Sequence, residues 1–85
     1  MEDPKAFAAG VGEAVRRARQ SLGWTQAQLA EFAGFSPNYI ARLERGELGP
    51  SLFVANQLCH TLGIEVDALL GGSSPAQRSG RRRVG

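Results

Sequence analysis

Apolar residues recur every three or four positions over the first quarter of the chain, which is the spacing of one helix face. From Pro4 to about Leu22 the pattern predicts one amphipathic helix, with Asp3 as its N-cap and Gly23 as a left-handed cap at its end. Gly10 and Gly12 each weaken this helix by roughly 1 kcal/mol relative to alanine, and indicate either fraying or close packing against a neighbour. The apolar positions are Phe7, Val11, Ala14, Val15, Ala18 and Leu22.

Two further helices begin with the same local device. Thr25 lies three residues before Gln28, the spacing of a reciprocal capping box. Ser36 is an N-cap candidate followed by Pro37, a residue that favours the first helical position. Between the two helices, Gly34 can adopt the left-handed conformation of a sharp turn. The apolar pairs expected to pack across the two helix starts are Trp24 with Leu29 and Phe35 with Ile40.

The rest of the chain predicts two more helices and a tail. Ser51 is the expected N-cap of a fourth helix that runs to about Leu62 and is closed by Gly63. Residues 64–70 are typical of a short fifth helix, and no segment alternates as a β-strand would. The predicted fold is therefore all-α, with a compact five-helix domain over residues 1–70 and a flexible, disordered basic tail over residues 71–85.

Charge is distributed unevenly between these two parts. Residues 71–85 hold four arginines and no acidic residue, a net charge of +4. In residues 1–70 the other 6 Lys and Arg face all 8 Asp and Glu, a net charge of −2. The predicted domain is slightly acidic, so only the placement of individual arginines can make it a nucleic-acid binder.

Several functional classes find no support in the sequence. At 85 residues the chain forms one domain at most, and no apolar run approaches the roughly 20 residues needed to span a bilayer. The single cysteine, Cys59, cannot form an internal disulfide, and its neighbour His60 diverges from it on a helix, so no metal site or cofactor is expected. No catalytic triad or phosphate loop is present, which argues against an enzyme. The lone cysteine is typical of a protein in a reducing cytoplasm.

Two helices joined by a short glycine turn describe a helix-turn-helix. Over roughly residues 13–70 the chain resembles the lambda-repressor/Cro-type family, also called XRE. The matching segments are LGWTQAQLAEFAGFSPNYIARLERG, then GPS at the start of the fourth helix, and LGIEVDALL near residue 70. Each segment alone is weak evidence for the family, but the segments together, in the correct register, are strong evidence for it.

The resemblance implies a lambda-repressor-like DNA-binding domain with the helix-turn-helix at about 25–45. Its second helix would cross the DNA backbone, and its third, at about 36–45, would enter the major groove. Gln26 matches a phosphate-binding position and Arg45 a backbone-contacting one. The base-facing positions are matched by Pro37, Asn38, Tyr39 and Arg42, and the two N-caps, Thr25 and Ser36, complete the candidate DNA-binding set.

The chemistry of these side chains fits that assignment. Asn38 can pair bidentately with adenine and Arg42 with guanine, each pair discriminating by roughly 1–3 kcal/mol. Tyr39 offers a ring for a thymine methyl and a hydroxyl for a phosphate. Pro37 either makes an apolar contact or only starts the helix.

Two pairs of residues are assigned other roles. Arg19 and Glu44 match family positions that form a buried ion pair between the first and third helices. Phe53 and Val54 stand where the family is commonly polar, which indicates either a two-fold dimer interface that they form together with Leu48 and the fifth helix, or packing on the first helix. Core packing is expected for Trp24, Phe32 and Leu43.

The sequence thus favours a DNA-binding transcriptional regulator that acts as a homodimer on a two-fold operator, from a prokaryote or a phage. The alternative is a protein-interaction module, antitoxin-like or an anti-regulator, that keeps the fold without specific DNA binding and has a regulatory protein as its partner. The arginine-rich tail is open to three interpretations: an arm for phosphate contacts, a lead-in to a partner region, or an inert end.

Overall fold

The computed structural model describes residues 3–70, which form five helices without a strand among them. The helices are α1 (Pro4–Ser21), α2 (Gln26–Ala33), α3 (Pro37–Glu44), α4 (Leu52–Leu62) and α5 (Val66–Leu70). The all-α prediction is confirmed, with α5 starting two residues later than expected. The predicted basic tail, residues 71–85, lies outside the described residues.

Local hydrogen bonds at the N-caps explain why α1, α2, α3 and α4 start where they do. The Thr25 hydroxyl accepts from the Gln28 amide at 3.0 Å while the Gln28 side chain accepts from the Thr25 amide at 2.8 Å, so the predicted capping box is confirmed. Asp3, Ser36 and Ser51 also cap their helices, accepting from the backbone N–H groups of Ala6, Tyr39 and Val54 respectively.

The turn between α2 and α3 depends on Gly34, whose φ of 84° lies in the left-handed region. Its amide and that of Phe35 both donate to the Ala30 carbonyl, at 2.9 and 2.8 Å, and satisfy the end of α2. A residue with a Cβ is disfavoured in this conformation. The sequence therefore sets both the end of α2 and the direction in which α3 begins.

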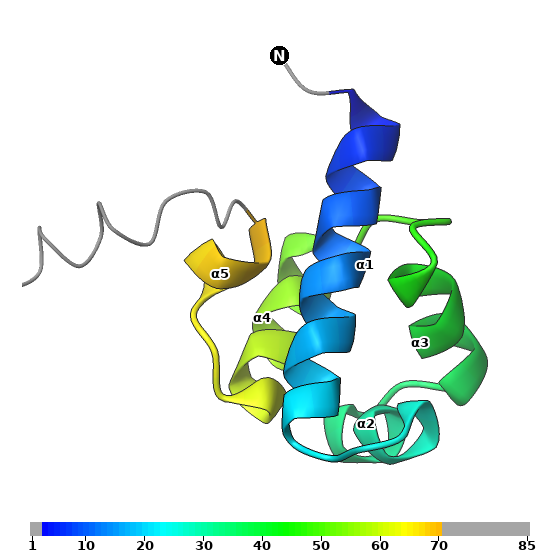
Figure 1. Ribbon diagram of the computed structural model, residues 1–85, viewed down its shortest axis with the longest axis vertical. Helices are drawn as coiled ribbons and strands as arrows, with labels where there is room; N and C mark the ends of the chain where they lie inside the picture. The colour runs from blue at the N-terminus through cyan, green and yellow to red at the C-terminus, as the bar shows by residue number, and fades with distance from the viewer. Residues whose placement is uncertain (1–2, 71–85) are drawn as a thin grey trace, which may run out of the picture.

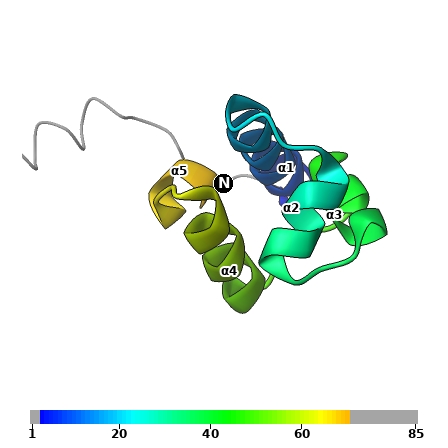
Figure 2. The same ribbon diagram turned by 90° about the horizontal axis from the view of Figure 1, so that it is seen from below.

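Helix α1 forms the centre of the molecule, with α2 and α3 on one side of it and α4 and α5 on the other (Figures 1 and 2). It contacts α3, α4 and α5, while α2 packs between α3 and α4. The short helices α3 and α5 lie on opposite sides of α1 (Figure 1).

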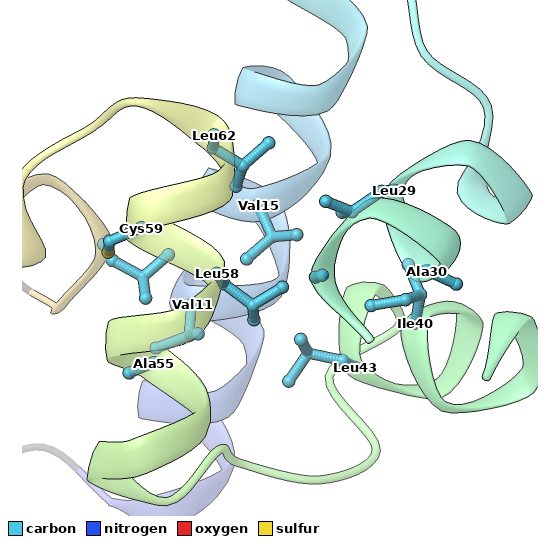
Figure 3. Packing of buried hydrophobic residues seen from close by; sticks show 12 residues of the cluster. Val11, Val15, Leu29, Ala30, Ile40, Leu43, Ala55, Leu58, Cys59 and Leu62 are labelled. Carbon is cyan, nitrogen blue, oxygen red and sulfur yellow. The ribbon is translucent and has the colours of Figure 1, made fainter. Parts of the chain in front are cut away.

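One continuous apolar core joins α1 to α4 (Figure 3). Its fully buried side chains come from all four helices and are Val11, Val15, Leu29, Ile40, Leu43 and Leu58. Leu69 closes the core from α5, and Cys59 is a buried thiol within it. The predicted core position of Leu43 is confirmed.

Phe32 was expected in this core, and that prediction is wrong, because the residue is 53% exposed. The buried face of α2 is formed by Leu29, Ala30 and Ala33. With about 100° of rotation per residue, Phe32 points roughly 100° away from the middle of that face. It contacts the ring of half-buried Trp24 edge-on at a centroid distance of 4.8 Å, so both aromatics lie at the rim of the core.

The two glycines of α1 have different roles. A Cβ on Gly12 would lie 2.4 Å from the Leu43 carbonyl oxygen and 2.7 Å from that of Glu44, so α1 and α3 touch backbone to backbone there. A Cβ on Gly10 would meet nothing within 4 Å. Close packing, and not fraying, explains Gly12.

This difference gives a paired test of the α1–α3 contact. We expect Gly12→Ala to lower the free energy of unfolding by about 1–3 kcal/mol or more, because backbone atoms must shift. Gly10→Ala should instead raise it by about 0.5–1 kcal/mol through helix propensity. Urea unfolding followed by circular dichroism measures both, and equal effects of the two substitutions would contradict the close approach.

Candidate nucleic-acid interface

Helix α3 divides into a buried face and an exposed face. Ile40, Leu43 and Glu44 point into the molecule. Asn38, Arg42 and Arg45 are exposed, and their spacing of four and three residues places them on one face of the helix. An exposed face that carries one amide and two guanidinium groups has the donors that base edges and phosphates accept.

At the start of α3, Ser36 and Pro37 are exposed, and Tyr39 is partly buried. The Tyr39 ring packs against Phe35 at a centroid distance of 5.4 Å and against the core, and burial raises the pKa of its hydroxyl. The ring is therefore held in place by the protein itself. Pro37 occupies the first helical position, as its sequence context predicts.

A buried carboxylate links α3 to the helices on either side of it. Glu44, whose side chain is 2% exposed, accepts from Arg19 Nε at 2.7 Å and from Arg19 Nη2 at 2.8 Å. Arg19 Nη1 donates to the Trp24 carbonyl at 2.8 Å, and its hydrogen bonds to Glu44 raise the pKa of the guanidinium. The ion pair thus fixes α1, the segment before α2 and the end of α3 together.

Gln26 takes part in the same network, which sequence reasoning did not anticipate. Its Nε2 donates to Glu44 Oε1 at 3.0 Å, so the side chain at the start of α2 is held against α3. An amide nitrogen has two N–H donors, and one remains for a phosphate oxygen beside the helix N-terminus. Thr25, the N-cap next to it, is exposed. Nothing in the sequence shows whether a glutamine at a helix start bonds a distant carboxylate or faces solvent alone, so this contact could not be predicted.

Glu47, just beyond α3, contacts both exposed arginines. Its Oε1 accepts from Arg42 Nε at 3.2 Å and its Oε2 from Arg45 Nε at 2.7 Å. The hydrogen bond from Arg45, and to a smaller extent the one from Arg42, lowers the pKa of the Glu47 carboxyl below its ordinary value. The hydrogen bond to Glu47 also raises the pKa of Arg45. The three side chains form an exposed charged cluster.

Phe53 and Val54 do not share one environment. Val54 is partly buried and packs against the core, whereas Phe53 is 70% exposed and its neighbour Leu52 is 74% exposed. Leu48, partly buried, packs against the core as well. The outward apolar pair at the start of α4 is therefore Leu52 and Phe53.

Residues 3–70 contain no cluster of three His, Cys, Asp or Glu that could hold a metal ion. The Cys59 thiol has a raised pKa, chiefly because of its burial. Among these residues no helix is long and apolar enough to cross a membrane.

The model of the helix-turn-helix family matches residues 15–69, which span the capped α2, the glycine turn and α3. The chain belongs to this family, in its XRE-type branch of DNA-binding transcriptional regulators. The fold is that of lambda-repressor-like domains.

Three comparisons place the chain more closely. It is 39% identical to the immunity repressor protein of Bacillus phage phi105 over 72% of this chain and 42% of the repressor, so it spans less than half of that relative's length. The restriction-modification controller protein C.AhdI from Aeromonas hydrophila is 30% identical, with a TM-score of 0.75, 81% of this chain covered and 100% of the other. The P22 c2 repressor protein in complex with synthetic operator 9T is 33% identical, with a TM-score of 0.70, covering 74% and 96%.

The Arg19–Glu44 pair gives a stability test that does not involve DNA. Because removal of one partner leaves a buried charge unpaired, Arg19→Ala should lower the free energy of unfolding by about 3–5 kcal/mol. The matched control is Arg17→Ala, which removes an arginine that is 75% exposed and paired with Glu13 on the surface of the same helix. That change should have little effect. A melting temperature of Arg19→Ala equal to wild type would rule out a stabilising role for the pair.

Proposed function

We propose that this protein is a sequence-specific transcriptional regulator that reads the DNA major groove with α3, as a homodimer on a two-fold operator. The observation that supports this most directly is the exposed face of α3, where Asn38 and Arg42 stand one turn apart on a helix whose other face is anchored in the core. Asn can pair with adenine and Arg with guanine through their base edges.

Phosphate contacts would set the position of that helix on the duplex. Gln26 lies at the N-terminus of α2, bonded to Glu44, and Arg45 lies one turn beyond Arg42 at the end of α3. The other candidate residues lie at the starts of the two helices, namely Thr25 before α2, and Ser36, Pro37 and Tyr39 at α3. Glu44 thereby connects a proposed phosphate contact on α2 directly to the helix proposed to read bases. The operator complex of the similar P22 c2 repressor agrees with DNA as the partner.

The homodimer would be formed through the apolar side chains at the start of α4. Leu52 and Phe53 are adjacent and mostly exposed, and two bulky apolar residues side by side are a feature of interaction surfaces. A second copy related by a two-fold axis would bury the same patch on both chains and present two α3 helices to the two half-sites of an operator. The cytoplasm, where prokaryotic and phage DNA lies, is the compartment this function requires.

A second function is favoured by one specific feature. Glu47 offsets part of the positive charge of Arg42 and Arg45, and α4 carries an exposed apolar pair. Both features suit a domain that binds a regulatory protein without specific DNA recognition. The DNA-binding experiment below separates the two.

The DNA function is tested by binding to the region upstream of the protein's own gene over a salt series. Arg42→Ala should lose about 1–3 kcal/mol, or roughly 5- to 150-fold, more on the preferred sequence than on others, because a base contact is removed in addition to a charge that acts on all sequences. Gln26→Ala should weaken binding to all sequences alike, because a phosphate contact is removed. Thermal melting of each variant controls for the loss of the Gln26–Glu44 bond. An absence of sequence preference in the wild type at moderate salt would favour the protein-interaction module.

The dimer is tested by sedimentation equilibrium of Phe53→Glu. A dimeric wild type beside a monomeric variant is expected, since a buried carboxylate at the two-fold patch would face its own copy. Leu22→Glu is the control, because Leu22 is 45% exposed and lies at the end of α1, outside the patch. A variant mass equal to that of the wild type would remove Phe53 from the interface.

A further inference from the structure

We propose that Glu47 is a specificity-determining residue: it holds Arg42 and Arg45 in a fixed arrangement and weakens their attraction to DNA of arbitrary sequence, so that the correct site is preferred. This inference rests on the proposed DNA-binding function. It concerns a residue whose charge is opposite to that of the two arginines beside it.

The carboxylate is anchored by the backbone and does not reach the arginines by chance. After the C-cap Arg45, the Gly46 amide donates to the Leu43 carbonyl and the Glu47 amide donates to the Arg42 carbonyl, both at 3.0 Å. With φ of 77° at Gly46, these two bonds form a Schellman motif. A Cβ on Gly46 would lie 3.0 Å from the Ala9 Cα, so the turn itself is pressed against α1. The fold therefore fixes the backbone of Glu47 beside both guanidinium groups.

The carboxylate of Glu47 halves the positive charge that Arg42 and Arg45 give to the exposed face of α3. Of the other arginines in the described chain, Arg19 is buried with Glu44, and Arg16 and Arg17 pair with Glu13 on α1. Arg42 and Arg45 are thus the described arginines that can supply positive charge at the proposed interface, and with Glu47 the three side chains have a net charge of +1. Binding to DNA of any sequence depends on such charges meeting phosphates, so Glu47 lowers that general affinity.

The contact to a base is affected less than the attraction to phosphates. Glu47 bonds the Nε atom of each arginine and leaves the two terminal nitrogens unused by that contact. Arg42 can therefore present both terminal nitrogens to the O6 and N7 atoms of guanine while its Nε–H keeps its bond to Glu47. A guanidinium already held in one orientation loses less freedom on binding. Specificity is the difference between the two affinities, and Glu47 lowers mainly the unwanted one.

The test compares Glu47→Gln with Glu65→Gln, which changes the net charge equally. Glu65 is exposed and belongs to the segment that leads directly into α5, and α5 lies on the side of α1 opposite to α3 (Figure 1). The probes are a 30-base-pair duplex selected by the wild type from a random pool, and a shuffled duplex of the same composition. Both are titrated by fluorescence anisotropy from low to high salt.

We expect Glu47→Gln to bind the shuffled duplex about eightfold more tightly at 0.1 M salt, with a salt slope steeper by about 1, as for one more counterion released. The selected duplex should gain less, so the ratio of the two affinities falls. Glu65→Gln should change either affinity by less than about twofold, since the ion pairs of Arg42 and Arg45 involve Glu47 and not Glu65. Equal gains on the two duplexes, or the same gains in Glu65→Gln, would overturn the proposal.

The proposed function and this inference fail in different ways. A wild type that selects no sequence from the pool contradicts sequence-specific DNA binding. The arginine Nε–Hε signals of the DNA-free protein test Glu47 independently of DNA: Glu47→Gln should shift two of them, and Glu65→Gln none. Unchanged signals in Glu47→Gln would overturn the role of Glu47 even if the wild type binds its operator.

Discussion

The structure depends on one buried carboxylate. Glu44 accepts three hydrogen bonds, two from Arg19 on α1 and one from Gln26 at the start of α2, while it belongs to α3 itself. A buried charge is tolerated only when such partners surround it, so the three helices must keep one arrangement for Glu44 to be satisfied. Next to it, the α3 backbone approaches Gly12 too closely for a side chain at that position of α1. These contacts set the position of α3 relative to the rest of the molecule.

The same arrangement separates the residues that hold α3 from those that face outward. Ile40, Leu43 and Glu44 fix the helix from inside, and Asn38, Arg42 and Arg45 project from the other side. Gln26 belongs to both groups, because its amide bonds Glu44 and also lies at a helix N-terminus suited to a phosphate. In the proposed complex, the contact that positions the domain on DNA and the helix that reads it would be connected by a single hydrogen bond.

Electrostatics gives this domain an unusual balance for a nucleic-acid binder. Its described part, residues 3–70, holds 6 Lys and Arg against 7 Asp and Glu, a net charge of 6 − 7 = −1, and Glu47 engages both arginines of the outward face of α3. Such a surface gains little from phosphates in general and more from correctly placed base edges. Exposed Leu52 and Phe53 add an apolar patch at the start of α4, and a second copy joined there would double the number of bases read. In the proposed dimer, weak general affinity and dimerisation would both favour discrimination between sequences over strength of binding.

The sequence alone determined the family and the starts of α1 to α4. The caps at Thr25 and Ser36 and the glycine turn at Gly34 involve atoms only a few residues apart, so the local sequence determines their geometry. Tertiary structure decided what depends on neighbours distant in sequence: that Gly12 and not Gly10 meets α3, that Phe32 stays at the rim, and that Val54 faces inward beside an exposed Phe53. It also joined Gln26 to Glu44, and Glu47 to two arginines. Those choices follow from how helices are rotated and packed against each other, which no single segment contains.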